Sequence, residues 1–143
     1  MSVAEAHVKP IFGPITVEEM QGNETLTRHI MKVVAEACKH TKGRYNAASV
    51  AQGLLGGKMK LWGVLTPPAE LEAAVVTKIE NGVLEVVIAG PSIHGILPFM
   101  DVLKRYAKAN GCTAATITGP EWFAHHLGKG WFMREVRFET KLA

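Results

Sequence analysis

The stretch that most constrains how this chain folds runs over residues 83–118, where two apolar runs flank a helical pattern. The first run, VLEVVIAG at 83–90, lies between an Asn-Gly pair and a Gly-Pro pair. An apolar run of this length between turn signals is typical of a strand buried on both faces. The second run, TAATIT at 113–118, is rich in Thr and is followed by another Gly-Pro pair, so it predicts a second strand.

The segment between these runs predicts a helix. Apolar side chains recur at helical intervals from Phe99 to Ala107, Pro98 suits the first turn, and Gly111 is a stop signal. A strand, a helix and a strand in this order form a crossover, which makes the two strands parallel and is almost always right-handed.

The loop from the first strand to the helix presents main-chain N–H groups at a helix N-terminus, a position that favours anions. We therefore predict a cradle for phosphate in this loop. The alternative is an ordinary connection in which Gly95 serves a turn. The loop residues are Ser92, Ile93, His94, Gly95 and Ile96.

The rest of the chain surrounds this crossover with further helices and strands. The Asn81-Gly82 pair is a strong signal for a hairpin between two strands, because a type I′ turn needs positive φ at both central residues. We predict one mixed α/β domain over 1–143, with a mostly antiparallel sheet and flanking helices. The other predicted strands are an edge strand within 6–14 and strands at 59–66, 71–80 and 131–142. Thr16 and Glu19 have capping-box spacing for a short helical turn, and Asn23 or Thr25 caps a helix whose apolar face covers 26–38 and which Gly43 stops. Asn46 caps a helix at 47–55, and a further helix is predicted at 121–127.

Composition and charge exclude several classes of protein. Hydrophobic residues make up 48% and charged residues 20% of the 143 residues, which is typical of a globular chain. No apolar stretch approaches the ~18 residues of a membrane helix. The first residues lack the pattern of a secretory signal, so we expect a cytosolic protein. The net charge of +3 is spread along the chain, which is a weak signal for nucleic-acid binding.

Cysteine and histidine usage gives no sign of a disulfide or a metal site. Cys38 and Cys112 lie far apart in apolar segments, and we expect two buried thiols. His125 and His126 are adjacent, so on a helix they point about 100° apart and cannot readily chelate one ion. We therefore predict no metal.

The order of the elements resembles that of the GNAT (Gcn5-related N-acetyltransferase) superfamily over most of the chain. The resemblance implies that the strands at 83–90 and 113–118 splay apart and hold the pantetheine arm of acetyl-CoA. It places that arm along Val87, Ile88 and Ala89, and the pyrophosphate on the loop that follows. It also implies direct transfer of acetyl to a primary amine. More narrowly, the sequence resembles small GNAT-like proteins of phages and prophages in the segments TKGRY, GGKMKLWGV, VVTKI, YAKANGC and ITGPEWFAHHLGKGW.

Three positions depart from or adapt the superfamily's pattern. Its phosphate loop reads Q/R-x-x-G-x-G/A, and here Ser92 stands at the first position and Leu97 at the second glycine. A leucine Cβ there crowds the main chain where it approaches the pyrophosphate. His126 stands where the family often has a tyrosine as general acid, and an imidazole can donate a proton to the leaving thiolate.

The resemblance implies that a carboxylate on the central strands is the general base, which removes a proton from the acceptor amine. Glu72, Glu80 and Glu85 lie on or beside these strands, and Glu85 is the best candidate because it interrupts an apolar run. The alternative is that alternation along a strand turns these side chains to solvent.

Two functions remain open on these residues. The first is a CoA-dependent N-acetyltransferase whose ligand is acetyl-CoA. The second is a catalytically degenerate GNAT-like protein, a phage virion or host-interaction component, that acts by binding a protein partner. The altered phosphate loop and the missing tyrosine favour the second.

Overall fold

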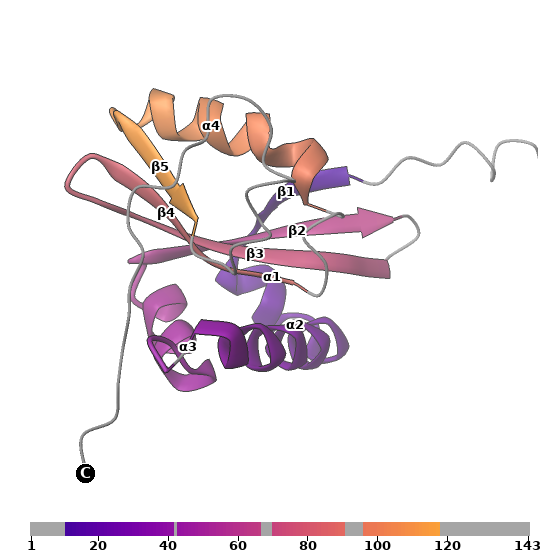
Figure 1. Ribbon diagram of the computed structural model, residues 1–143. Helices are drawn as coiled ribbons and strands as arrows, with labels where there is room; N and C mark the ends of the chain where they lie inside the picture. The colour runs from indigo at the N-terminus through magenta and orange to yellow at the C-terminus, as the bar shows by residue number, and fades with distance from the viewer. Residues whose placement is uncertain (1–10, 42, 67–69, 91–95, 118–143) are drawn as a thin grey trace, which may run out of the picture.

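A computed structural model describes residues 11–41, 43–66, 70–90 and 96–117 of this chain. Its helices and strands follow the predicted order as far as the description extends (Figure 1). In chain order the elements are β1 (Ile11–Ile15), α1 (Val17–Gln21), α2 (Glu24–Cys38), η2 (Lys39–Thr41), α3 (Ala47–Leu55), β2 (Met59–Thr66), β3 (Glu70–Glu80), β4 (Val83–Gly90), η4 (Leu97–Phe99), α4 (Met100–Ala109) and β5 (Ala114–Ile117).

The five described strands form one sheet in the order β1-β2-β3-β4-β5. Neighbours are antiparallel from β1 to β4, and β4 and β5 are parallel. In Figure 1, α1, α2 and α3 lie on one face of the sheet and α4 lies on the other. The predicted mixed, mostly antiparallel sheet with flanking helices and a parallel crossover is therefore confirmed.

The hairpin between β3 and β4 has the predicted turn. Asn81 has φ 53° and Gly82 has φ 74°, the positive values that a type I′ turn requires at both central residues. This turn sets the register in which Val83 faces Glu80, and with it the pairing of the two central strands.

Polar side chains cap the first three helices, as the sequence predicts. Thr16 and Glu19 form a capping box at α1, and the Asn23 side chain accepts a hydrogen bond from the Leu26 N–H at 3.0 Å. Asn46 caps α3 in the same way. These bonds satisfy main-chain N–H groups that would otherwise lack a partner in the first turn.

The end of α2 differs from its prediction. The sequence extends this helix toward Gly43, whereas the structure ends it at Cys38 and continues with η2. The Thr41 hydroxyl donates to the Cys38 carbonyl oxygen at 2.7 Å, and it also accepts from the Tyr45 N–H at 3.2 Å. A side chain therefore satisfies a carbonyl group at the helix end and closes the following loop.

Each face of the sheet carries its own apolar cluster. The cluster under α1, α2 and α3, here named the three-helix face, includes Ile30, Val34 and Val76, which are fully buried. The cluster under α4, here named the α4 face, includes the buried Trp62, whose indole N–H donates to the buried Thr77 hydroxyl at 3.0 Å. The sheet is thus covered on both faces.

Both described cysteines are free thiols, so the expectation of no disulfide is confirmed. Cys38 is buried, and its burial raises the pKa of the thiol. Cys112 is half-buried, so the expectation of full burial was wrong for this residue. Among the described helices, none has both the length and the apolar character needed to span a membrane.

Several predictions lie outside the described residues. They concern the helix at 121–127, the strand at 131–142, the loop residues Ser92–Gly95, and the single-domain extent over 1–143. These remain predictions.

The end of α4 shows why Gly111 is needed. Gly111 has φ 79°, its N–H donates to the Lys108 carbonyl at 3.1 Å, and the Cys112 N–H donates to the Ala107 carbonyl at 2.9 Å. This is a Schellman motif, which requires a residue in the left-handed region after the helix. It turns the chain back, and the Thr113 N–H then bonds to the Gly82 carbonyl at 2.8 Å just before β5.

Replacing Gly111 with alanine should lower the free energy of unfolding by about 1–2 kcal/mol, because an L-residue is strained at positive φ. Urea unfolding followed by circular dichroism measures this change. Gly13→Ala is the matched control, since a Cβ built there meets nothing within 4 Å and its φ lies outside the positive range. Equal effects of the two substitutions would contradict the role given to Gly111.

Candidate active site

The candidate site lies on β4, whose described pairing with β5 is shorter than its pairing with β3. Residues Val83 to Val86 pair with Ala114 to Ile117 of β5, and among the described residues this parallel pairing ends there. On the other side, β4 keeps its pairing with β3 as far as Gly90. Successive main-chain groups of a strand point to alternate sides, so part of 87–90 directs N–H and C=O groups away from β3.

A β-bulge marks the same place on β4. Thr77 faces Val86 and the next residue of β3, Val76, faces Ile88, so Val87 is an extra residue. Val87 and Ile88 are consecutive, yet both are buried in the cluster of the three-helix face. A bulge bends its strand and increases the local twist.

The helical segment after β4 starts without a side-chain cap. Neither Ile96, before η4, nor Phe99, before α4, provides a capping hydrogen bond, in contrast to Thr16, Asn23 and Asn46 at the other helices. Uncapped N–H groups at a helix start, together with the helix dipole, favour an anion. Farther along α4 the exposed Lys104, Arg105 and Lys108 add positive charge.

Ile96 and Leu97 both pack against the α4 face. Ile96 is fully buried, and its carbonyl accepts the Phe99 N–H at 2.8 Å. Leu97 is half-buried against the same cluster. The side chains of both residues are therefore occupied by packing, and the Phe99 and Met100 N–H groups are bonded within the segment.

Glu85, on the paired half of β4, is surrounded by polar groups from a distant loop and from β3. The Tyr45 hydroxyl donates to Glu85 Oε2 at 2.7 Å, and Arg44 Nη2 lies 3.6 Å from the same oxygen. Lys78 Nζ lies 3.9 Å from Glu85 Oε1 and 3.6 Å from Glu80 Oε2. We name these five residues the Glu85 cluster. The Glu85 side chain is 20% exposed, so it is neither fully solvated nor sealed in the core.

Lys78 is held as a cation within this cluster. The hydrogen bond with Tyr45 raises the pKa of Lys78, burial lowers it, and the charges of Glu85 and Glu80 raise it further. The pKa lies above its ordinary value as the net result. Lys78 Nζ and Arg44 Cζ each lie 5.5 Å from the centre of the Tyr45 ring, where a cation is attracted to the aromatic face.

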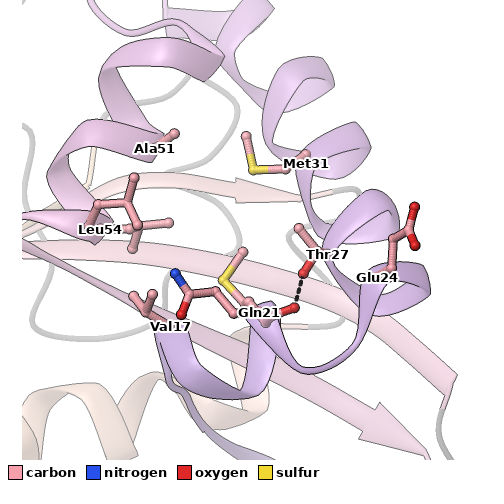
Figure 2. Close-up of a pocket in the computed structure, with 9 residues that line it drawn as sticks. Val17, Gln21, Glu24, Thr27, Met31, Ala51 and Leu54 are labelled. Carbon is pink, nitrogen blue, oxygen red and sulfur yellow. Dashed lines mark hydrogen bonds between the residues drawn. The ribbon is translucent and has the colours of Figure 1, made fainter.

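A separate groove of about 430 Å³ lies between α1, α2 and α3 (Figure 2). Its wall is largely apolar, and the Thr27 hydroxyl at its edge donates to the Met20 carbonyl. None of the predicted site residues lines it. The lining residues are Val17, Met20, Gln21, Glu24, Thr27, Met31, Ala51, Leu54 and Leu55.

Solved acetyltransferases share this arrangement of strands and helices. An aminoglycoside acetyltransferase from an uncultured soil metagenomic sample has 13% sequence identity and a TM-score of 0.63, covering 94% of this chain and 99% of its own. A GNAT family acetyltransferase from Staphylococcus aureus has 9% identity and a TM-score of 0.59, covering 94% and 99%. The chain has the GNAT acetyltransferase fold.

A third similar structure contains a CoA compound. AAC(6')-Iy, solved with the bisubstrate analogue CoA-S-monomethyl-acetylneamine, has 13% identity and a TM-score of 0.59, covering 93% of this chain and 99% of its own. No protein-family model and no curated protein sequence matches the chain. The GNAT fold is therefore shown by structural similarity, which does not determine the reaction.

Within the GNAT fold, the structure brings part of the predicted site together. Glu85, Val87, Ile88 and Ala89 lie on β4, and Ile96 precedes the next helix. Ser92, Ile93, His94, Gly95 and His126 lie outside the described residues, so their roles stay predictions. Among the described residues no group of three or more potential metal ligands occurs.

Sequence reasoning missed Tyr45, Arg44 and Lys78 as neighbours of Glu85. The segment TKGRY contributes to the resemblance, but nothing in its spacing points to Glu85, which lies 40 positions away from Tyr45. The alternation of β3 places Lys78 on the same face as Glu85, opposite it in the register. The predicted hairpin implies this cross-strand pair, which was the one signal in the sequence for a neighbour of Glu85.

The raised pKa of Lys78 predicts a pH-dependent stability. Its contribution is complete below the ordinary value near 10.5 and is lost as the pH rises through the higher folded-state value. Lys78→Met should therefore destabilise the protein at about pH 8 by at most ~1 kcal/mol, and less at about pH 11.5. Urea unfolding at both pH values measures this. Lys58→Met is the control, since Lys58 is exposed and forms no ion pair within the described residues. A difference that grows with pH would contradict the assignment.

Proposed function

We propose that this protein transfers an acetyl group from acetyl-CoA to a primary amine. The observation that carries the proposal is the β-bulge at Val87, which lies on the strand before a helix start without a side-chain cap, in a chain with the GNAT fold. We propose that the β5 side of 87–90 is a strand edge. Such an edge and the main chain at a helix start suit the two ends of one ligand. The edge suits a chain of amide groups, and the helix start suits a phosphate.

Acetyl-CoA has both of these features. Its pantetheine arm contains amide groups that would pair with the main chain of Val87, Ile88 and Ala89 as an added strand. Its pyrophosphate would lie on the loop Ser92–Ile96 and the start of the helix. Leu97 packs its side chain against the α4 face. The Phe99 N–H bonds to the Ile96 carbonyl and the Met100 N–H bonds to the Leu97 carbonyl, so the proposed contacts are the N–H groups that precede Pro98.

The chemistry assigned to the residues follows from direct transfer. Acetyl-CoA supplies an activated thioester, and the reaction forms a C–N bond and breaks the C–S bond. Glu85 takes the proton that the amine loses, and main-chain N–H groups near Ile88 and Ala89 donate to the carbonyl oxygen where charge develops. His126 returns a proton to the departing sulfur. Positioning of the two reactants provides much of the rate.

The charges around Glu85 support an acceptor with few positive charges. The Glu85 cluster contains two cations, Arg44 and Lys78, and two carboxylates, so its formal charge is balanced. Aminoglycosides carry several ammonium groups and need a strongly negative surface. We therefore propose a monoamine, although one similar structure is an aminoglycoside acetyltransferase solved with sisomicin.

The narrower resemblance to phage-encoded proteins stays a prediction, as does a cytosolic location. The alternative function, a degenerate GNAT-like protein that binds a virion or host partner, depends on Ser92, Leu97 and His126 standing in place of the usual residues. Turnover of acetyl-CoA distinguishes the two functions, because the alternative requires none.

The cofactor site is tested with a pair of substitutions at Leu97. Leu97→Asp and Leu97→Asn lose the same packing, but only the first places a negative charge at the helix start. Acetyl-CoA should bind at least about tenfold more weakly to Leu97→Asp than to Leu97→Asn, because the carboxylate repels the pyrophosphate. Isothermal titration calorimetry measures both affinities.

Acetyl transfer is measured by release of free CoA thiol with a panel of monoamines, polyamines and aminoglycosides. Turnover with a monoamine is the expected result. Faster turnover of aminoglycosides would contradict the acceptor class. Absence of binding by the wild-type protein at millimolar acetyl-CoA would contradict the transferase function itself.

A further inference from the structure

The two oxygens of the Glu85 carboxylate have different surroundings. Oε2 accepts the hydrogen bond from the Tyr45 hydroxyl at 2.7 Å and lies 3.6 Å from Arg44. Oε1 accepts no hydrogen bond from the described residues, and the Lys78 ammonium lies 3.9 Å from it. One oxygen is therefore held and the other has its lone pairs available to a proton.

The group that holds Oε2 is itself firmly placed. The Tyr45 N–H donates to the Thr41 hydroxyl at 3.2 Å, and that hydroxyl lies 2.7 Å from the Cys38 carbonyl at the end of α2. The Tyr45 ring packs against the cluster of the three-helix face, and both Arg44 and Lys78 lie against it. Main chain, ring and hydroxyl of Tyr45 are thus each restrained by separate contacts, which lowers the entropy lost when it orders Glu85.

Glu85 also stands at the right point along β4 for this restraint to matter. It faces Thr116 one residue before the last described pair with β5, at Val86, and two residues before the bulge at Val87. Two residues of strand span roughly 7 Å. A carboxylate at this distance from the proposed thioester position reaches an attacking amine directly or through one water, provided that its rotamer is fixed.

We infer that Tyr45 is a positioning residue for Glu85: its hydroxyl fixes Oε2 and leaves Oε1 as the oxygen that receives the amine proton. This inference rests on the proposed transferase function and adds a residue that the resemblance does not supply. Tyr45 does not touch the reacting atoms. It acts on the rate through Glu85 alone.

The test is a double-mutant cycle on acetyl transfer with Tyr45→Phe and Glu85→Gln. Tyr45→Phe keeps the ring with the two cations against it, and removes the hydroxyl together with its bonds to Glu85 and Lys78. It should lower kcat about 10- to 100-fold, the range expected when a reacting group is misplaced. The KM for acetyl-CoA should stay unchanged. In the Glu85→Gln background the same substitution should cost less than about twofold, since the carboxylate it positions is gone.

A matched control and a second variant keep the result independent of folding. Tyr106→Phe should leave kcat unchanged, because Tyr106 lies on the α4 face against Trp62 and Lys60, and no described residue bonds to its hydroxyl. Thr41→Val, which releases the main chain of Tyr45, should lower kcat in the same direction, and Thr41→Ser should restore it. Circular dichroism melts confirm that each variant is folded.

The outcomes separate the inference from the proposed function. Wild-type kcat in Tyr45→Phe, with Glu85→Gln impaired, overturns the positioning role and leaves the transferase. Losses that multiply in the double variant also overturn it, because Tyr45 would then act independently of Glu85. No turnover by the wild-type protein overturns both.

Discussion

The candidate site depends on one constraint, the β-bulge at Val87 in β4. Thr77 of β3 faces Val86 and Val76 faces Ile88, so Val87 is an extra residue. The bulge directs both Val87 and Ile88 into the core of the three-helix face. Burial of such side chains is worth about 1.5–3 kcal/mol each. The bulge is therefore held by packing on one face of the sheet.

The second half of the site is placed by α4, whose two ends are built differently. Its C-terminal end is closed by the Schellman motif at Gly111, which returns the chain to β5 beside the β3–β4 turn. Its N-terminal end, with η4, has no side-chain cap. Aromatic packing among Phe12, Trp62 and Phe99 anchors this end on the sheet. The Phe99 and Met100 N–H groups bond to the Ile96 and Leu97 carbonyls, so main-chain groups rather than a side chain close this first turn.

The Glu85 cluster shows how a charged strand residue is accommodated at the rim of an apolar core. A carboxylate that is 20% exposed needs partners, and the structure supplies a hydroxyl and two cations from different elements. These partners order the side chain as well as stabilising it. The contacts that stabilise the partly buried Glu85 carboxylate therefore also give it a defined orientation. A proton acceptor in catalysis requires such an orientation.

The sequence determined most of the secondary structure and the type of sheet, because these depend on residues that are close together in the chain. The caps at Thr16, Asn23 and Asn46, the turn at Asn81-Gly82 and the stop at Gly111 all act over a few residues, so their signals are complete in the sequence. The crossover order likewise determined that β4 and β5 are parallel. Glu85 could be singled out because a carboxylate in an apolar run is conspicuous.

Only the tertiary structure decided where β4 bulges and which residues surround Glu85. In the run VLEVVIAG several neighbouring residues are apolar and suit either face, so the sequence pattern cannot tell which one is the extra residue of a bulge. Tyr45 and Glu85 are 40 positions apart and meet because α2, η2 and β4 pack together. Such a contact depends on the packing of whole elements. A cap or a turn depends on neighbouring residues in the chain, so caps and turns could be predicted from the sequence and this contact could not.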